Sequence, residues 1–355
     1  MTLDTTLPET APPAASVPSR KRWHSTESVV LAVVAGLAAG AVLLLAVGAN
    51  PLTAYKDMVA GTLGTRSDIG LVLVEVAPLL LIGLGLAIAF RAKVWNIGAE
   101  GQFVMGALIG GWFAIEVPIG SPVLMVAFTW IIAAAAGGLW GAAVGWLKAQ
   151  WNVNEVISSL LLNYAAVFTL NYAVRKPLRA PNGFQPVSAT LPDAARLPDV
   201  PGGVPVHIGL LAGLVLVPVA MYVLARTPFG FRVRMMGFNV EAAEAAGVAP
   251  RPMYLKIMTL SGAFAGLAGV IQVMGPETRL TNNITAAGFG FTAIVVALIG
   301  RNHPVGVLAA AVFLGMLTLG GDVIQRTQDV PRTMTLVLQA MFVLFLLVAE
   351  KARRR

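Results

Sequence analysis

Long apolar runs recur along this chain, and short loops that hold most of its charge separate them. A helix needs about 20 apolar residues to cross the ~30 Å hydrocarbon core of a bilayer. Ten runs approach that length, which predicts an all-α polytopic membrane protein with about ten transmembrane helices. The runs cover residues 29–48, 69–90, 96–116, 122–147, 154–174, 207–225, 257–275, 286–300, 304–321 and 334–350. The third and eighth are the least uniform, so a broken or re-entrant helix is an alternative there.

Polar residues interrupt this pattern most clearly at residues 95–102, Trp-Asn-Ile-Gly-Ala-Glu-Gly-Gln. Unpaired polar groups lose several kcal/mol on leaving water, so they persist between apolar runs only where they face protein, water or a bound solute. Gly98 and Gly101 weaken a helix and let backbone approach closely. Two interpretations stay open: a polar turn at the membrane surface beside Arg91 and Lys93, or a broken helix that lines a solute path.

The composition supports a membrane protein. The chain is 57% hydrophobic and 12% charged, which is roughly half the charge of a water-soluble domain. Because it has no cysteine, it holds no disulfide, thiolate metal site or cysteine nucleophile. The basic residues behind its net charge of +8 lie in short loops rather than on a basic helix with interleaved aromatics, so nucleic acid is not expected as a partner.

The orientation of the chain follows from the excess of Lys and Arg expected in cytoplasmic loops. With ten crossings both termini share one side, and that side holds 16 of the 25 Lys and Arg. Both termini are therefore predicted to be cytoplasmic, although one early span more or fewer would reverse most loops. The first run is longer than the ~7–15 residues of a secretory signal core and is interpreted as an uncleaved helix.

The pattern divides the chain into three parts. Residues 1–28 are predicted to be a disordered cytoplasmic tail, residues 29–350 the transmembrane domain, and residues 351–355 a basic cytoplasmic C-terminus. The sequence Ala-Leu-Ile-Gly occurs at residues 107–110 and again at residues 297–300. The two copies lie in the third and eighth predicted helices, which are an odd number of helices apart. Such an offset reverses the orientation and favours an inverted repeat with a solute site near the midplane.

Two loops differ from the others. Residues 175–206 are Pro-rich and are predicted to lie outside, as a connector or as a surface for an external partner. Residues 226–256 are predicted to lie inside and to contain a short Ala-rich helix at residues 241–247, with Pro250 beyond it. That helix is a candidate docking element for a soluble partner, and a solvated connector is the alternative.

Small residues predict close helix contacts at two places. Gly137, Gly141 and Gly145 recur every four residues, as do Gly262 and Gly266. Small residues on one face let membrane helices approach closely, and they carry no information about a solute.

Motifs for catalysis and nucleotide binding are absent from the sequence. There is no Gly-Lys pair and so no Walker A phosphate loop, which means that any ATP must bind another chain. His24, His207 and His303 are far apart, and there is no Gly-x-Ser-x-Gly elbow. The chain is expected to be neither an enzyme nor the holder of a cofactor or metal.

Polar side chains within or beside the apolar runs are the candidates for a solute path. They are Glu75, Asn96, Glu100, Gln102, Asn163 and Gln272. A proton relay would need more ionisable groups in series. Neutral amides and hydroxyls suit an uncharged, polyhydroxylated solute better than an ion.

Three segments together carry a family resemblance. They are residues 96–102, residues 154–164 (Asn-Glu-Val-Ile-Ser-Ser-Leu-Leu-Leu-Asn-Tyr) and the loop at residues 237–247. These segments resemble bacterial ABC importer permeases, most closely the nucleoside branch of the branched-chain amino acid/ribose/nucleoside permease family. The resemblance covers roughly residues 29–350. The loop departs from the family at residues 249–252, where Ala-Pro-Arg-Pro stands in place of an Ile-x-Leu-Pro pattern.

The resemblance implies a type II ABC importer-like fold, with two inverted five-helix repeats, in the lipid of the bacterial cytoplasmic membrane. It implies a second permease as a heterodimer partner, a cytoplasmic ABC ATPase that binds the ATP, and an extracellular substrate-binding lipoprotein. The implied residues for coupling to the ATPase are Glu241, Ala242, Ala243, Glu244 and Gly247. The implied function is translocation of nucleosides into the cytoplasm. Import of ribose-like sugars and an ion-coupled secondary transporter are the alternatives.

Overall fold

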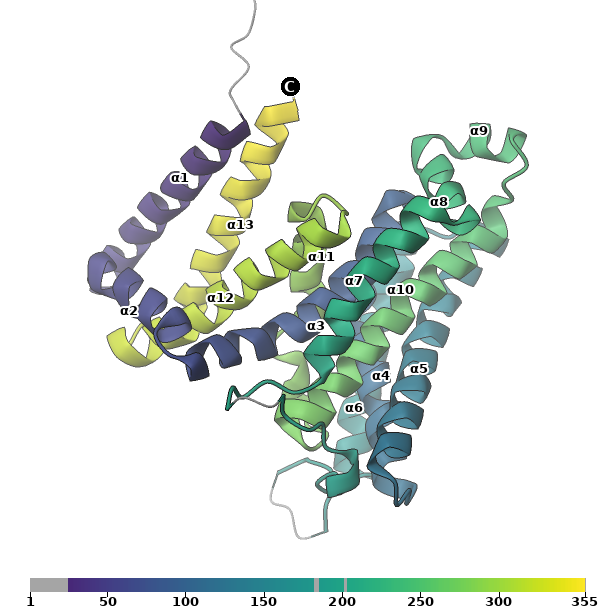
Figure 1. Cartoon of the computed structure of the whole chain (residues 1–355), viewed down its shortest axis with the longest axis horizontal. Helices are drawn as coiled ribbons and strands as arrows, with labels where there is room; N and C mark the ends of the chain where they lie inside the picture. The colour runs from purple at the N-terminus through teal and green to yellow at the C-terminus, as the bar shows by residue number, and fades with distance from the viewer. Residues whose placement is uncertain (1–24, 182–184, 201–202, 355) are drawn as a thin grey trace, which may run out of the picture.

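The computed structural model describes residues 25–181, 185–200 and 203–354, which are helical apart from turns, connecting loops and isolated β-bridges (Figure 1). Most of the predicted N-terminal tail, residues 1–24, lies outside the described residues. The α-helices are α1 Ser25–Ala46, α2 Pro51–Leu63, α3 Arg66–Arg91, α4 Ala99–Glu116, α5 Pro122–Trp151, α6 Glu155–Arg175, α7 Gly209–Arg226, α8 Pro228–Phe238, α9 Val240–Ala245, α10 Pro250–Gln272, α11 Phe289–Ile299, α12 Pro304–Gln328 and α13 Arg332–Arg354. Short helical turns are η1 Asp193–Ala195, η2 Val273–Glu277 and η3 Asn282–Thr285.

Helices long and apolar enough to cross a membrane confirm a polytopic membrane protein. Seven such helices occur among the described residues, and a bent pair made of part of α1 and α2, with an angle of 115° between them, would make an eighth. The count of ten is not confirmed, because α4 carries polar residues in its first turn and the apolar helix at Arg332–Phe345 is shorter. Helix α2 was not predicted from the apolar pattern, although Asn50 and Pro51 form a helix start signal there.

Helix α3 forms the centre of the molecule. In its most apolar stretch 78% of the residues are buried, and in α10 with η2 72% are, whereas in α5 and α6 only 28% are. A helix that is apolar on all sides belongs in the interior, and the buried stretch from Val76 to Phe90 in α3 is of that kind. Helices α5 and α6 therefore lie at the outside of the bundle and present side chains to whatever surrounds this chain.

The predicted glycine contacts are confirmed between α5 and α10. A Cβ atom on Gly137 would lie 2.6 Å from the Cα of Gly266, and one on Gly145 would lie 2.9 Å from the Cα of Leu255. Real Cβ atoms do not approach other atoms so closely. These glycines therefore set the distance between the two helix backbones.

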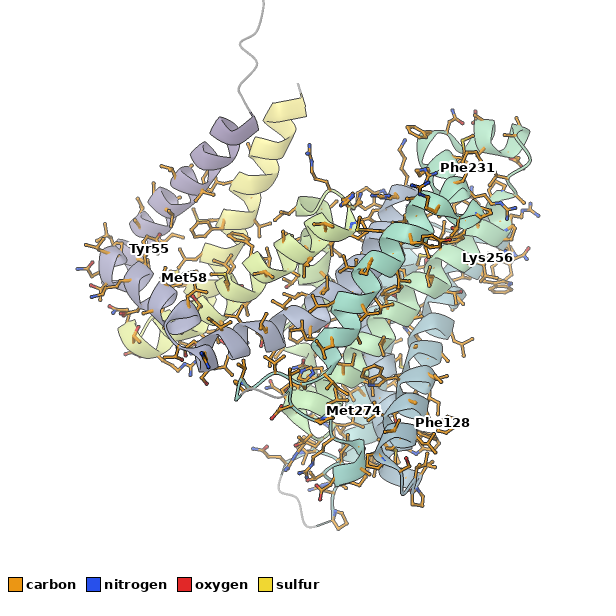
Figure 2. All side chains as sticks on the ribbon, viewed as in Figure 1. Tyr55, Met58, Phe128, Phe231, Lys256 and Met274 are labelled. Atoms are coloured by element: carbon orange, nitrogen blue, oxygen red, sulfur yellow. The ribbon has the colours of Figure 1, made fainter. Side chains whose placement is uncertain are left out.

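A second, smaller apolar cluster joins α1, α2, α12 and α13. Figure 2 labels two of the α2 side chains that contribute to it, Tyr55 and Met58. The Tyr55 hydroxyl donates a hydrogen bond to the Leu37 carbonyl oxygen at 2.7 Å. The Met58 side chain packs against Gly320 in α12. Helix α2 therefore ties the N-terminal helix to the C-terminal pair.

The two ends of the molecule carry different connections. Helices α8 and α9 lie at the same end as the start of α1 and the C-terminus, and the segment between α6 and α7 lies at the opposite end (Figure 1). That segment is pinned by backbone hydrogen bonds from Leu191 N to Thr278 O and from Leu197 N to Met274 O, both 2.9 Å. The two loops that sequence analysis assigned to opposite sides therefore do lie at opposite ends.

Candidate functional site

The break between α3 and α4 is organised around Asn96, which is fully buried. The Asn96 Nδ2 donates to Gln102 Oε1 at 2.8 Å and to Ser261 Oγ at 2.9 Å. The Asn96 Oδ1 accepts from Gly98 N at 3.0 Å and from Gln102 Nε2 at 3.1 Å. One amide thus uses its full hydrogen-bonding capacity and ties the break to α4 and α10.

Helix α4 begins without a cap of its own, because its N-cap residue is Gly98. Asn163 of α6 supplies the missing group: its Oδ1 accepts from Gly101 N at 2.8 Å. Its Nδ2 donates to the Ile97 carbonyl oxygen at 2.9 Å. The free N–H groups at a helix start need partners when they are buried, and here the partner comes from another helix.

Helix α11 begins in the same way. Its N-cap is Gly288, in a left-handed conformation with φ +59°, and no side chain next to it forms a cap. Glu100 of α4 supplies the acceptor, with Oε2 2.7 Å from Gly290 N. A carboxylate is favoured at this position because the helix dipole is positive there. A Cβ on Gly290 would lie 2.5 Å from the Glu100 Cα, so the two helix starts touch through backbone.

The second Glu100 oxygen, Oε1, has no hydrogen-bond partner, although the residue is only 3% exposed. A buried carboxylate oxygen without a partner is costly. Among the acceptors described so far, Glu100 Oε1 is therefore the one that can still accept a hydrogen bond. The donor would be a solute, a water molecule or a protein group brought close by a movement of the helices.

We call Asn96, Glu100, Gln102, Asn163 and Ser261 the polar junction. The junction brings together four of the six predicted path residues. Ser261 is the member that sequence analysis missed, and its place next to the glycine of an α10 contact, Gly262, was the available signal. The polar junction joins α4, α6, α10 and α11 in the middle of an apolar bundle.

The other two predicted path residues lie outside this junction. Glu75 is part-exposed in α3 and forms no hydrogen bond among the described residues. Gln272 is buried at the end of α10, and its Oε1 has no partner. The structure therefore divides the six candidates, and a path-lining role for each of them stays a prediction.

The described residues contain no group of three or more His, Cys, Asp or Glu that would hold a metal ion. The polar junction consists of two amides of asparagine, one of glutamine, a hydroxyl and a carboxylate, so it offers hydrogen bonds and no nucleophile activated by a base. This chemistry suits binding and holding rather than catalysis.

The predicted short helix in the loop before α10 is present as α9. Asn239 caps it, with Oδ1 2.9 Å from Ala242 N. Glu241, Ala242 and Glu244 are exposed, and Ala243 is buried where α9 packs against α8 and α10.

The end of α9 is also as expected. Gly247 follows the helix with φ +84°, a conformation that favours glycine. A Cβ atom at Gly247 would meet nothing within 4 Å, so the backbone angle alone selects glycine here.

Helix α8 connects α9 to the centre of the bundle. A Cβ atom on Gly237 would overlap the carbonyl oxygen of Arg91, the last residue of α3. The Arg91 Nε donates to the Asn302 carbonyl oxygen at 2.8 Å, in the turn between α11 and α12. Movement of α8 would therefore be felt at the end of α3, next to the break that holds Asn96.

Two cavities open at the opposite end of the molecule. One of about 440 Å³ is lined by Arg175, Lys176, Arg179 and Pro186. A second of about 460 Å³ is lined by residues 185–187 together with Glu277 and residues 281–283. Arg175, in the lining of the first cavity, is the last residue of α6.

Just before α7, His207 is buried and neither of its ring nitrogens has a hydrogen-bond partner among the described residues. Burial lowers the pKa of His207, and the nearby charge of Asp199 opposes that shift. The imidazole ring is therefore favoured in its neutral form. It packs against Gly275 in η2.

The known proteins that this chain resembles include several ABC transporter permeases. The glucose ABC transporter permease protein TsgB13 of Haloferax volcanii is 38% identical over 352 residues, covering 96% of this chain and 91% of that protein. The guanosine ABC transporter permease protein NupP of Bacillus subtilis is 33% identical, covering 89% and 91%. The nucleoside ABC transporter permease protein NupB of Lactococcus lactis is 29% identical, covering 90% of each chain. No solved structure matches.

The family model described as branched-chain amino acid transport system / permease component matches residues 69–347. That range contains the polar junction, α8 and α9. The chain therefore belongs to this family of ABC transporter permeases, which are transport subunits rather than enzymes.

Proposed function

We propose that this chain is a permease subunit of an ATP-driven importer that moves nucleosides into the cytoplasm. The observation that carries the proposal is the match to NupP and NupB over about nine-tenths of both chains. The uncharged amides and hydroxyl of the polar junction agree with it, because a nucleoside is an uncharged solute with many hydrogen-bonding groups. The junction lacks the chains of ionisable groups that ion-coupled carriers use.

The proposed assembly has this chain beside a second, different permease, with both termini and α9 in the cytoplasm. A cytoplasmic ABC ATPase binds the ATP and docks on α9, and an extracellular substrate-binding lipoprotein delivers the solute at the end that carries the two cavities. Paired guanosine permeases in one organism, NupP and NupQ, support the second permease. We further propose ten crossings in two inverted repeats, in which α4 and α11 are the shortened helices.

We propose that Glu241, Ala242, Ala243, Glu244 and Gly247 form the coupling element. A push on α9 reaches α8, and the contact of Gly237 with the Arg91 carbonyl carries it to the end of α3. The break after α3 leads directly to Asn96 and so to the polar junction. A rigid-body shift transmitted in this way changes how α4, α6 and α11 meet, which is the motion that alternating access requires.

The six polar residues Glu75, Asn96, Glu100, Gln102, Asn163 and Gln272 are proposed to border the path. In the arrangement described here most of the junction's polar atoms bond to one another, so it acts first as the device that sets helix positions. Glu100 Oε1 and Gln272 Oε1 have no partner and are the acceptors free for solute hydroxyls when the helices shift.

A sugar is the second candidate solute. The glucose permease TsgB13 shares the greater identity with this chain, 38% against 33% for NupP. Hydrogen-bonding amides serve a hexose or a ribose as well as they serve a nucleoside.

The test is uptake by the complete transporter, with its second permease, ATPase and binding protein, in proteoliposomes. Radiolabelled guanosine, uridine, ribose and glucose are compared with and without ATP. We expect ATP-dependent uptake of at least one nucleoside that a hundredfold excess of glucose does not reduce. Uptake of glucose or ribose without any nucleoside would overturn the nucleoside assignment.

A further inference from the structure

Helix α6 has two opposite faces. One face holds Asn163 in the polar junction and buries Ser159. The other points away from this chain and carries Tyr164, Phe168 and Tyr172, which are 58%, 68% and 65% exposed. We call the residues Leu161, Tyr164, Phe168, Asn171 and Tyr172 the aromatic face of α6. Their spacing of three and four residues places them along one side of the helix.

The aromatic face also carries two polar groups, the hydroxyl of Tyr164 and the amide of Asn171. Tyr164 is at the middle of the helix, which runs from Glu155 to Arg175, and its hydroxyl has no hydrogen bond among the described residues. The amide of Asn171 has none either. Tyrosine at a membrane surface is ordinary, and Asn171 is only one turn from the end of the helix, but the unpaired hydroxyl of Tyr164 at mid-helix requires a polar neighbour or water.

Helix α5 provides the contrast within the same bundle. It is as little buried as α6, yet its exposed positions in the span are apolar, including Phe128, Ile131 and Leu139. Its one hydroxyl, on Thr129, is buried. That is the pattern of a lipid-facing helix, and Figure 2 shows Phe128 on the outer side of α5.

A cavity lies at the end of α6, beyond the aromatic face. Arg175 follows Asn171 by four residues and Phe168 by seven, so it continues the same side of the helix. It lines the cavity of about 440 Å³ together with Lys176, Arg179 and Pro186. A basic cavity thus lies at the end of α6, on the side of the helix that carries the row of aromatic side chains.

From this geometry we propose that the aromatic face of α6 lines a water-filled solute path and that the rings of Tyr164 and Phe168 stack on the planar base of a nucleoside. The proposal rests on the nucleoside import proposed above. Every base has a π-face, so stacking binds nucleosides with little preference among them. The Asn171 amide offers both a donor and an acceptor to the sugar hydroxyls or base edge. On the opposite face, the bonds of Asn163 to Gly101 N and to the Ile97 carbonyl oxygen hold the α6 backbone against the start of α4.

The first test uses water access. The natural chain has no cysteine, so Tyr164→Cys, Phe168→Cys and Asn171→Cys each introduce a single thiol. The complete transporter is treated with a charged methanethiosulfonate reagent, and modification of this chain is read by mass spectrometry. Only a hydrated thiol forms the thiolate that reacts. Leu139→Cys, in the middle of α5, is the matched control for a lipid-facing site.

We expect modification of the Tyr164, Phe168 and Asn171 sites, slowed at least fivefold by saturating guanosine, and no modification of the Leu139 site. Absence of modification at all three sites would mean that lipid or a dry contact with the second permease covers the face, and would overturn the proposal. Modification that no transported solute slows would overturn the solute contact.

The second test separates stacking from assembly. Phe168→Ala is expected to raise the KM for nucleoside uptake by roughly tenfold, the effect of losing one stacked ring. Phe168→Trp should restore it, and Leu139→Ala should leave it unchanged. Pull-down of the ATPase measures assembly. Unchanged KM in Phe168→Ala, with normal assembly, would overturn the stacking. If the wild-type transporter imports glucose and no nucleoside, the proposal of nucleoside import is wrong, and so is stacking on a base. If glucose then slows modification of the three cysteine sites, the proposal that α6 lines the solute path still holds.

Discussion

Two kinds of helix start occur in this protein. Helix α9 is capped by its own neighbour, since Asn239 accepts a hydrogen bond from Ala242 N three residues later. Helices α4 and α11 begin at glycine and receive their caps from other helices, through Asn163 and Glu100. The first kind is exposed at one end of the molecule, and the second lies buried within the bundle.

The difference follows from the solvent around each start. At an exposed end water can replace a lost cap, so a local side chain suffices and its loss costs about 1 kcal/mol. Within an apolar bundle no water replaces it, so the cap also decides where two helices meet. The buried starts therefore fix the packing of α4, α6 and α11, and the exposed start fixes only the short helix that it begins.

The largest effect is expected for Asn163→Ala. This change leaves Gly101 N and the Ile97 carbonyl oxygen buried and unpaired. Each unpaired buried group costs about 1–3 kcal/mol, so we expect a loss of stability of roughly 2–6 kcal/mol and little remaining uptake. Thermal unfolding in detergent and uptake in proteoliposomes measure the two effects.

Asn154→Ala is the control on the same helix. Asn154 caps the exposed start of α6, with its Oδ1 2.9 Å from Val156 N. We expect a loss of only about 1 kcal/mol and near-normal uptake. Equal losses for the two variants would show that burial does not distinguish the two kinds of cap.

A smaller effect is expected for Gly290→Ala, at the contact of α11 with α4. The added Cβ would lie 2.5 Å from the Glu100 Cα, so the helix starts must separate, at a cost of about 1–3 kcal/mol. Gly288→Ala is the matched control, because it meets no atom within 4 Å and changes only a left-handed backbone position. It should cost about 1 kcal/mol. The comparison fails if Gly288→Ala reduces uptake as much as Gly290→Ala does.

The sequence allowed prediction of local features and little of the long-range ones. The membrane class, the cap-and-glycine boundaries of the loop helix and the α5–α10 glycine contacts each depend on residues a few positions apart. The polar junction does not, because Asn163 meets Gly101 from 62 residues away and Glu100 meets Gly290 from 190. Polar residues at 96–102 showed that something unusual lies there. Which helix start each one caps depends on the packing of distant helices.

Gly247→Val is expected to have a moderate effect, confined to coupling. The valine side chain meets no neighbour, but a β-branched residue at φ +84° costs about 1–2 kcal/mol and should displace the end of α9. We expect the membrane part to unfold at the wild-type temperature while uptake per ATP hydrolysed falls several-fold. Glu241→Arg combined with Glu244→Arg should weaken ATPase pull-down without changing the backbone. Wild-type pull-down and uptake in both variants would show that α9 is only a connector.

The smallest effect is expected for Asn239→Ala, which removes the single bond from Asn239 Oδ1 to Ala242 N. The N-cap of an exposed helix is worth about 1 kcal/mol, and α9 has only six residues, so it should fray before it docks. If docking requires the ordered helix, affinity for the ATPase falls by about fivefold, the equivalent of that free energy. The unfolding temperature should stay unchanged, because α9 lies at the end of the bundle and water replaces the lost bond. Asn239→Asp keeps an acceptor and should restore affinity, so titration of the ATPase against the three proteins separates the cap from any other role of Asn239. A fall in unfolding temperature as large as that of Asn163→Ala would contradict the distinction between exposed and buried helix starts.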